Sequence, residues 1–317
     1  MDIALRKLLE KQQYRIVGNN SAVKICTWTR KSLKDQGVCY KEKFYGIRCH
    51  RCCQMTPDVN YCQNSCVFCW RNLEGTEKDN KDMIVDDPIL IIEGTKKAHN
   101  KLLEGFKGDA SVGKKKYLES LEPMHYAISL SGEPTLYPRL AELIKGLHKR
   151  GKTTFLVTNG LMPDALSLLE KKNTLPTQLY VSIDAPNKEL FFKIDRSSLK
   201  DGWELLMQTL DLMKKLKKKT RTTLRITAIK GLNIVEPEKY AALIIQSDAT
   251  FVEVKSYMNV GSSRERLSYD NMPLHEEIRA FANQICKYCG YKIIDEQKES
   301  RVVLMMKKDR KDRIMKF

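Results

Sequence analysis

The chain has 317 residues, which is long enough to bury a sizeable core without disulfide support. Its 56 Lys and Arg exceed its 39 Asp and Glu, and the net charge of +17 suits a phosphate-rich partner. Because it has no run of about 18 apolar residues and its N-terminus lacks the apolar core of a signal peptide, we expect no membrane span. We therefore expect a cytoplasmic protein, in which clustered cysteines bind metal or react rather than form disulfides.

Three of the cysteines near the N-terminus are evenly spaced. Cys26, Cys39 and Cys52 form C-x12-C-x12-C, and Cys49 and Cys53 lie close by. Three thiolates can bind three irons of a cubane cluster and leave the fourth iron open to a small carboxylate or carbonyl ligand. Alternatively, Cys49 or Cys53 supplies a fourth ligand, and the cluster is a closed electron-transfer centre. The residues leave both alternatives open.

A second group of cysteines follows a candidate strand at residues 52–59. Cys62, Cys66 and Cys69 form C-x3-C-x2-C on the loop after it. Structural zinc usually takes four ligands in two pairs, and no pair of suitable spacing completes this set. Three thiolates again suit a cubane cluster with one open iron. A basic zinc protein that binds RNA without catalysis is the alternative.

The rest of the chain alternates between predicted strands and helices. Apolar, β-rich segments begin near residues 125, 152, 178, 222 and 251, and each ends in Gly, Pro, Asn or Asp. Residues 137–151 between two of them have apolar side chains at helical spacing. Together with residues 52–59 these segments give six predicted strands, and residues 300–307 are a possible seventh. This pattern predicts a mainly parallel α/β sheet with functional loops at the carboxyl ends of its strands.

Several remaining features have less specific interpretations. Cys286 and Cys289 form an isolated C-x2-C, which we expect to be two packed thiols, and His125 is expected in the core. The candidate contacts to a phosphate-rich partner such as RNA are the basic residues Arg264 and Arg266, the run at 214–221 and the segment 307–313.

The second cysteine group resembles the cluster loop of the radical S-adenosylmethionine (SAM) enzymes. Its spacing and the aromatic Phe68 before the last cysteine match that loop, and "SGEP" at 131–134 resembles the GGEP motif of the superfamily, with Ser131 in place of the first Gly. The resemblance implies a partial (β/α)6 TIM-like barrel with N- and C-terminal extensions. It also implies a 4Fe-4S cluster whose open iron binds SAM, and reductive cleavage of SAM to a 5′-deoxyadenosyl radical.

The same resemblance assigns candidate contacts to SAM. The implied SAM-binding residues are Ser131, Gly132, Glu133, Asn159, Ser182 and Asp184. The implied ligands of the SAM-binding cluster are Cys62, Cys66 and Cys69, and those of an auxiliary 4Fe-4S cluster are Cys26, Cys39 and Cys52.

Longer stretches are similar to one radical SAM family, the wyosine-forming tRNA 4-demethylwyosine synthases. They include residues 43–71, 129–138, 182–187 and 254–267. This resemblance implies a lyase that converts N1-methylguanosine at position 37 of tRNA(Phe) to 4-demethylwyosine, with a two-carbon unit from pyruvate. A different two-cluster radical SAM enzyme acting on RNA, such as a methylthiotransferase, is the catalytic alternative.

The resemblance also implies partners and a lysine that forms a Schiff base with pyruvate. Lys41 is the preferred candidate and Lys43 the alternative. No flavodoxin-like domain fits before Cys26, so an external donor of flavodoxin or ferredoxin type is expected. We expect a monomer with an N-terminal extension at 1–47, a radical SAM core at 48–262 and a C-terminal extension at 263–317.

Overall fold

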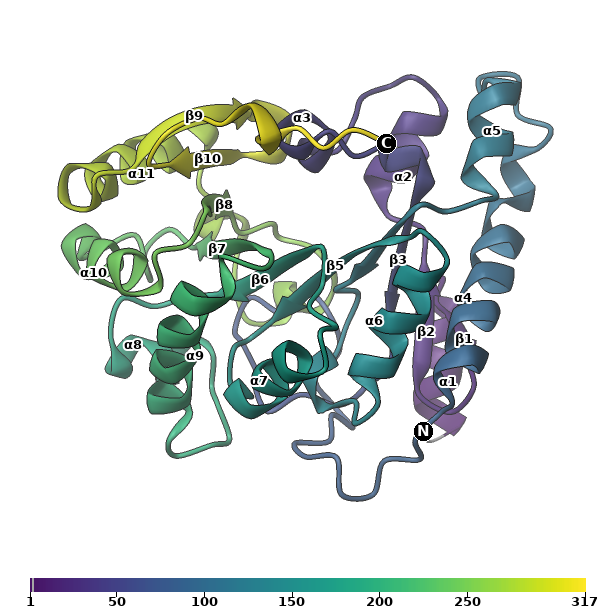
Figure 1. Ribbon diagram of the computed structural model, residues 1–317, viewed down its shortest axis with the longest axis horizontal. Helices are drawn as coiled ribbons and strands as arrows, with labels where there is room; N and C mark the ends of the chain where they lie inside the picture. Colours follow the sequence, from purple (N-terminus) through teal and green to yellow (C-terminus); the bar gives the residue numbers. More distant parts are fainter. Residues whose placement is uncertain (2) are drawn as a thin grey trace.

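The computed structural model describes Met1 and residues 3–317, and its strands form one mixed sheet (Figure 1). The strand order is β1-β2-β3-β4-β5-β6-β7-β8-β10-β9. The strands are β1 (Arg15–Val17), β2 (Ser21–Lys24), β3 (Cys52–Thr56), β4 (His125–Ile128), β5 (Thr153–Thr158), β6 (Gln178–Ser182), β7 (Arg221–Ala228), β8 (Phe251–Ser256), β9 (Lys292–Gln297) and β10 (Val302–Met306).

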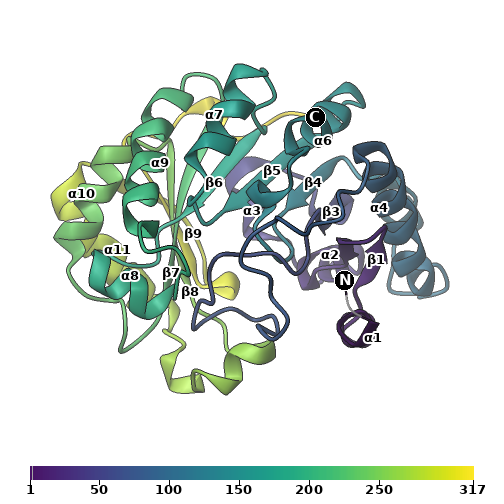
Figure 2. The ribbon, with the colours of Figure 1, turned by 90° about the horizontal axis from the view of Figure 1, so that it is seen from below.

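The central six strands, β3 to β8, pair in parallel in chain order. Figure 2 shows them curved around an interior, with helices covering the outer face. The six predicted strands and the mainly parallel α/β sheet are therefore confirmed. The helices are α1 (Ile3–Lys11), α2 (Thr27–Leu33), α3 (Tyr40–Tyr45), α4 (Pro88–Leu103), α5 (Lys114–Ser120), α6 (Leu140–Lys149), α7 (Pro163–Lys171), α8 (Lys188–Ile194), α9 (Gly202–Leu216), α10 (Pro237–Ser247) and α11 (His275–Cys289).

The main core lies between the parallel strands and the outer helices. The helix α6 illustrates its origin, because its apolar side chains recur at helical spacing and are buried, whereas the other side of the helix is charged. Cys289 is buried in this core and Cys286 packs partly against it, as expected for two packed thiols. His125 is also fully buried, and its ring accepts a hydrogen bond from the Arg48 backbone amide.

Antiparallel strands extend both edges of the parallel sheet. On one side β2 pairs with β3 and β1 with β2, and on the other β10 pairs with β8 and β9 with β10. The possible seventh strand thus exists as β10, but it runs antiparallel and does not continue the parallel set. The strands β1, β2 and β9 were not predicted, because β1 and β2 have only three and four residues and β9 has no strongly apolar face.

A second apolar cluster fills the end of the barrel where the parallel strands begin. The short helix α3 packs Tyr40, Phe44 and Tyr45 against inward-facing side chains that include Tyr180 of β6 and Phe251 of β8. Because α3 lies across this end, its side chains can reach the barrel interior. The cluster therefore positions the N-terminal residues that the sequence singled out.

No helix among the described residues is long and apolar enough to cross a membrane. No disulfide bond links any of the ten cysteines.

Candidate active site

The cysteine loop follows β3 at the carboxyl end of the parallel strands. It is fixed by backbone hydrogen bonds to distant segments: the Cys62 amide donates to the Glu77 carbonyl at 2.9 Å, and the Val67 amide donates to the Ile194 carbonyl at 2.8 Å. The three cysteines are partly buried. The loop is thus held in place by its neighbours rather than by regular secondary structure.

Arg266 contributes to this anchoring. Its Nε donates to the Val67 carbonyl at 3.1 Å, and another guanidinium nitrogen donates to the Cys69 carbonyl. Its side chain is 15% exposed, whereas Arg264 lies at the surface. The hypothesis that Arg266 contacts RNA is therefore not supported, because its guanidinium is used inside the protein.

Two charged residues contact the thiols of the loop directly. The Arg71 Nε donates to the Cys69 sulfur at 3.3 Å, and the Cys66 thiol lies 3.3 Å from the Asp195 carboxylate. Burial alone would lower the pKa of Arg71. The neighbouring Cys62 and Cys69 thiolates have a larger combined effect, so the pKa is raised. Burial and then Asp184 raise the pKa of Asp195. Thus a buried cation lies beside the cysteines, as an anionic cluster would require.

The structure brings all six predicted SAM-binding residues and the three cysteines of the loop into one pocket of about 200 Å³. These residues come from the last residue of β6 and from the loops after four consecutive parallel strands, β3 to β6, whose carboxyl ends share one edge. The shared members are Cys62, Cys66, Cys69, Ser131, Gly132, Glu133, Asn159, Ser182 and Asp184.

Glu133 is already engaged with the protein. One carboxylate oxygen accepts hydrogen bonds from the Thr135 and Thr158 hydroxyls, both at 2.6 Å. The other accepts from the Asn159 backbone amide at 2.7 Å. The side chain is 2% exposed. Glu133 therefore joins the loops after β4 and β5, and only its second oxygen retains room for another donor.

Gly132 is required by the close approach of two loops. Its φ is +73°, and a Cβ atom there would lie 1.9 Å from the Asp58 carbonyl oxygen. The neighbouring Ser131 hydroxyl donates to the Val59 carbonyl at 3.0 Å. The "SGEP" turn thus packs directly on the segment between β3 and the cysteine loop.

The other predicted contacts lie at the ends of β5 and β6. The Asn159 side-chain amide donates to Gln63 at 3.2 Å, and the Asp184 carboxylate accepts from the Thr227 amide at 2.7 Å. Burial raises the pKa of Asp184 to about 6. Ser182 is half-buried and lines the pocket.

Two polar atoms that line the pocket have no hydrogen-bond partner among the described residues, as expected for a site that holds a 4Fe-4S cluster with bound SAM. The Asn64 side-chain oxygen and one terminal nitrogen of Arg71 are buried without a hydrogen-bond partner among the described residues, and both residues line the pocket. A ligand with anionic and donor groups would satisfy both atoms. No three His, Cys, Asp or Glu side chains in the described part of the chain lie close enough to bind one metal ion, whereas cubane thiolates bind separate irons.

The upstream cysteines come from three different elements. Cys26 precedes α2, Cys39 precedes α3 and Cys52 begins β3. Burial raises the pKa of the Cys39 thiol to about 12, with Cys26 as the next cause, and burial followed by Cys26 also raises the pKa of Cys52. The three thiols are therefore close enough to interact electrostatically, and residues far apart in the chain form one donor set.

The two candidates for a fourth ligand have other contacts. Cys53 follows Cys52 in β3, so its side chain points to the opposite face and is buried in the main core. The Cys49 sulfur accepts from the Cys39 backbone amide at 3.3 Å and lies 3.9 Å from the Trp28 carbonyl. This arrangement favours a set of three thiolates, which fits a cubane cluster with one open iron.

Lys41 extends from α3 into the barrel interior. Its ammonium group lies 4.3 Å from the Tyr180 ring centroid and 5.3 Å from that of Phe155, and the residue is 9% exposed. Burial and then Arg225 lower the pKa of Lys41, although neighbouring cysteines oppose the shift. Lys41 therefore lies in a cationic, aromatic environment beside the upstream cysteines.

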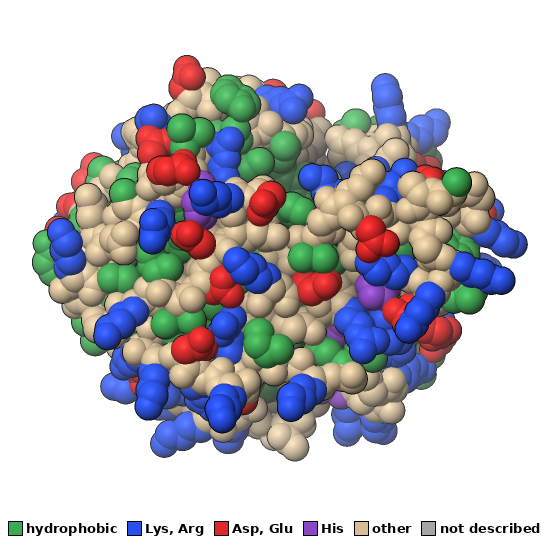
Figure 3. Space-filling view, turned by 90° about the horizontal axis from the view of Figure 1, so that it is seen from above, with side chains coloured by type: hydrophobic (Ala, Val, Ile, Leu, Met, Phe, Trp, Pro, Cys, Tyr) green, Lys and Arg blue, Asp and Glu red, His purple; other side chains and the backbone are tan. Residues whose placement is uncertain are grey.

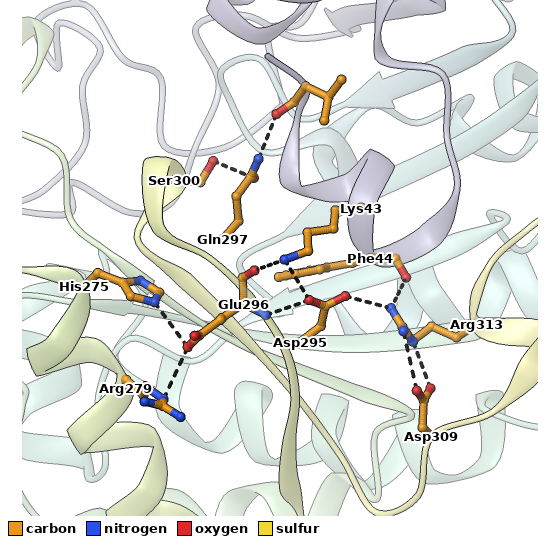
Figure 4. Close-up of polar contacts among 11 residues, drawn as sticks. Lys43, Phe44, His275, Arg279, Asp295, Glu296, Gln297, Ser300, Asp309 and Arg313 are labelled. Atoms are coloured by element: carbon orange, nitrogen blue, oxygen red, sulfur yellow. Dashed lines mark hydrogen bonds and ion pairs between the residues drawn. The ribbon is translucent and has the colours of Figure 1, made fainter.

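Lys43 points toward Asp295 and Glu296 of β9 (Figure 4). Its ammonium group pairs with the Asp295 carboxylate at 3.0 Å and donates to the Glu296 carbonyl at 2.5 Å. Its side chain is 48% exposed. Lys41 and Lys43 are two positions apart on α3, and this spacing puts them on nearly opposite sides of the helix. Only Lys41 therefore faces the interior.

Most of the hypothetical RNA contacts lie away from this edge. The run at 214–221 leads into the first residue of β7, and its Lys217 and Lys219 pair with Asp248 and Glu170. In Figure 3, which views the molecule from the end where α3 lies, Lys and Arg are interspersed with Asp and Glu. The structure does not bring this run, or residues 307–313, to the pocket.

Sequence reasoning missed several residues of the site. They carry no local signal, because Asp195 is 129 positions from its partner Cys66, and Arg225 and Glu253 lie within strands where a charge usually faces solvent. Only Arg71, two residues after Cys69, could have been suspected, since a cation next to thiolates stabilises their charge.

Comparisons with known families agree with the geometry. A family described as wyosine base formation matches residues 246–307, and the radical SAM superfamily matches residues 112–244. The S-adenosyl-L-methionine-dependent tRNA 4-demethylwyosine synthase of Pyrococcus abyssi is 51% identical over 306 residues, which cover 95% of this chain and 88% of that protein. Its counterpart in Methanocaldococcus jannaschii is 44% identical over 310 residues, 96% of each chain.

Solved structures lead to the same family. A structure of TYW1 with a lysine-pyruvate adduct bound has a TM-score of 0.88 and 39% identity, and covers 99% of both chains. A crystal structure of archaeal TYW1 has a TM-score of 0.80 and 38% identity, and covers 99% of this chain and 100% of that one. These matches favour neither a methylthiotransferase nor a non-catalytic zinc protein. The chain therefore belongs to the radical SAM superfamily and, within it, to the tRNA 4-demethylwyosine synthase family of enzymes.

Proposed function

We propose that the protein converts N1-methylguanosine at position 37 of tRNA(Phe) to 4-demethylwyosine, using SAM and a two-carbon unit from pyruvate. The observation that carries this proposal is the arrangement of two three-cysteine sets, with Lys41 projecting into the barrel interior beside the upstream set. One site for SAM and one site for a ketone are what a radical addition of carbon atoms to a methylated base needs.

We propose that Cys62, Cys66 and Cys69 hold the cluster that binds SAM. The reduced cluster with bound SAM would supply a 5′-deoxyadenosyl radical that removes a hydrogen atom from the N1-methyl group of the base. The chain's own residues position SAM: Ser131, Gly132 and Asn159 form the rim of the pocket. Glu133 keeps this rim rigid and has one carboxylate oxygen available to accept from the methionine ammonium group.

Cys26, Cys39 and Cys52 would hold an auxiliary 4Fe-4S cluster with one iron open to the pyruvate carboxylate or ketone. The support is chemical: the three partly buried cysteines influence one another's pKa, Cys53 lies on the opposite face of β3, and the Cys49 sulfur accepts from the Cys39 backbone amide. Such a cluster would hold pyruvate by its carboxylate end, with the ketone carbon open to Lys41 and to the methylated base and the methyl group kept as its substituent.

Lys41 is proposed to form a Schiff base with pyruvate. Its nitrogen attacks the ketone carbon, a C=N bond replaces the C=O bond, and the ketone oxygen leaves as water with two hydrogens from the amine. The placement of Lys41 supports this role over Lys43, which is paired with Asp295 at the surface. The relative whose structure contains a lysine-pyruvate adduct supports the same chemistry.

The remaining partners follow from the architecture. Both cysteine sets and Lys41 come from a single chain, so we propose that a monomer is active. The electron is proposed to come from an external flavodoxin or ferredoxin, and ten cysteines without a disulfide bond fit a reducing cytoplasm.

Labelled pyruvate tests this function. The anaerobic holoenzyme is incubated with tRNA containing N1-methylguanosine 37, SAM, dithionite and pyruvate labelled at individual carbons, and the nucleosides are analysed by mass spectrometry. We expect label from the keto and methyl carbons in the tricyclic base and none from the carboxyl carbon. The same tRNA without the N1-methyl group is the control and should stay unlabelled. No label in the methylated tRNA, with both clusters intact, would reject the proposal.

A further inference from the structure

A second pocket lies beside Cys26, and no ligand has been assigned to it above. Its volume is about 540 Å³, which is within the usual range for pockets that bind small molecules. The N-terminal region lines it with Lys24, Cys26 and Arg30, β3 contributes Gln54, and the cysteine loop contributes Trp70. The pocket is therefore bounded by both cysteine regions of the molecule.

Trp70 is the wall that the two pockets share. It directly follows Cys69 and lines both the SAM pocket and the pocket beside Cys26. Its carbonyl accepts from the Ser262 amide at 2.9 Å, and Gly261 approaches so closely that a Cβ atom there would lie 2.1 Å from this oxygen. Tyr14 stacks against the indole, with ring centroids 6.1 Å apart and planes at 18°. Trp70 is thus a rigid, partly exposed aromatic surface between the two cysteine sets.

Two cations line the same pocket. The Lys24 ammonium group lies 5.1 Å from the Trp70 ring centroid, and the Arg30 guanidinium donates to the Gln13 side chain at 2.6 Å. Arginine carries five N–H donors, so most of those of Arg30 remain for a ligand. The Gln54 amide lies on the same face of β3 as Cys52, since the two residues are two positions apart.

This combination matches one kind of nucleobase. A guanine that is methylated on N1 has lost its Watson–Crick donor at that position, whereas its Hoogsteen edge and its flat face are unchanged and are available to a protein. That edge presents O6 and N7, two acceptors that arginine and lysine bind. Single-stranded RNA bases that are turned out of the stack are held by aromatic side chains in the same way.

We propose that the pocket beside Cys26 binds the turned-out N1-methylguanine base, with Trp70 as its stacking surface and Arg30 on O6 and N7. The inference rests on the proposed function, because that reaction needs the N1-methyl group between the SAM site and the upstream cysteines. A base in this pocket would lie next to Cys26 of the upstream set and to Trp70, which also lines the SAM pocket.

The test compares two anticodon stem-loop RNAs that differ only at position 37, one with N1-methylguanosine and one with an abasic residue. Binding to the anaerobic holoenzyme is measured by fluorescence anisotropy. We expect the wild type to prefer the base by roughly tenfold or more, since stacking and a bidentate contact each contribute on this scale. Arg30→Gln and Trp70→Ala should reduce this preference without weakening the abasic RNA, and Trp70→Phe should keep most of it. Arg150→Ala, at an exposed arginine after α6, is the matched control and should behave as the wild type.

Other outcomes would overturn the inference. If Arg30→Gln weakens both RNAs equally, Arg30 contacts the phosphate backbone and the pocket does not read the base. A wild type without any preference, or variants that keep the full preference at unchanged iron content, would also reject it. If the wild type prefers the base through Arg30 and Trp70 but transfers no carbon from pyruvate, the base pocket stands and the proposed reaction fails.

Discussion

The two cysteine sets reach the same barrel by different routes. Cys62, Cys66 and Cys69 lie within eight consecutive residues on one loop, so their spacing alone defines the set. Cys26, Cys39 and Cys52 come from three elements, and tertiary packing brings them together. The first set therefore depends on local loop geometry, whereas the second depends on how α3 and the N-terminal strands pack on the barrel.

The largest expected effect separates the two sets by chemistry. Replacing Cys62, Cys66 and Cys69 by Ala should abolish 5′-deoxyadenosine formation from SAM, because the cluster that would bind SAM is lost. Replacing Cys26, Cys39 and Cys52 should abolish 4-demethylwyosine but leave SAM cleavage with dithionite detectable. Each triple variant should lose about four irons per chain, measured by iron analysis after anaerobic purification. Cys286→Ala is the control, and equal losses of SAM cleavage in both triple variants would show that the sets do not act separately.

A smaller but still large effect is expected at the lysine beside the upstream set. Lys41→Gln should lower product formation by at least about 10³-fold, as removal of a nucleophile usually does. It should also remove the pyruvate adduct that borohydride traps, detected as a mass increase on the tryptic peptide. Lys43→Gln should retain the adduct, because its ammonium group is paired with Asp295 outside the barrel. An adduct that moves to Lys43 or persists in Lys41→Gln would disprove the assignment.

The dependence of the upstream set on packing can be tested at Glu253. This buried carboxylate accepts from the hydroxyls of Tyr40 at 3.1 Å and Tyr45 at 2.7 Å, and pairs with Arg225 at 3.1 Å. It therefore ties α3 to β7 and β8. Glu253→Gln should lower the free energy of unfolding by about 3–5 kcal/mol, since it leaves a buried guanidinium without its partner.

The same variant should affect the two sets unequally. We expect it to weaken the trapped pyruvate adduct more than SAM cleavage, because Lys41 belongs to α3. Tyr45→Phe, which removes one hydrogen bond to the same carboxylate, should cost less, about 1.5–3 kcal/mol in chemical denaturation. An unfolding free energy unchanged by Glu253→Gln would show that α3 is not held by this network.

A weaker effect is expected at the anchor of the cysteine loop. Arg266→Ala removes two hydrogen bonds to the carbonyls of Val67 and Cys69, worth about 2 kcal/mol in total. We expect the loop cluster to be lost about tenfold faster in air, followed by absorbance, while the upstream cluster persists. Arg264→Ala, two residues away at the surface, is the matched control. If both variants instead weaken tRNA binding alike and leave cluster lifetime unchanged, Arg266 binds RNA.

The smallest effect concerns a residue outside both sets. Burial lowers the pKa of His99 on α4 from 6.5 to about 4, and its ring hydrogen-bonds the Ser120 carbonyl at 3.2 Å. Between pH 4 and 6.5 the unfolded chain binds a proton on His99 that the folded protein does not. The contribution of neutral His99 to the free energy of unfolding is therefore complete above pH 6.5 and is lost as the pH falls toward 4. From pH 7 to 5.5 we expect a loss of about 1 kcal/mol in the free energy of unfolding.

His99→Gln keeps a donor for Ser120 without a titrating ring, so its unfolding free energy should vary less over this pH range. SAM cleavage and pyruvate trapping should show no difference between this variant and the wild type. An identical pH dependence of stability in both proteins would rule out His99 as its source.

The sequence predicted the parts of the molecule that depend on local pattern. The six parallel strands follow from apolar segments bounded by turn residues, and the loop cysteines follow from their spacing. The strands β1 and β2 are too short for such a pattern. The outward direction of Lys43 depends on how α3 docks, and the use of Arg266 inside the protein depends on a carbonyl 199 positions away. Long-range packing therefore decides what local sequence leaves open.

The comparison is tested most directly by adding each small molecule to each triple variant and recording the electron paramagnetic resonance spectrum of the reduced cluster that remains. We predict that SAM changes the spectrum of the protein lacking Cys26, Cys39 and Cys52, and that pyruvate changes the spectrum of the protein lacking Cys62, Cys66 and Cys69. Each molecule should leave the other variant's spectrum unchanged. A pyruvate effect on the loop cluster, or none on the upstream cluster, would contradict the assignment of the two sets to two substrates.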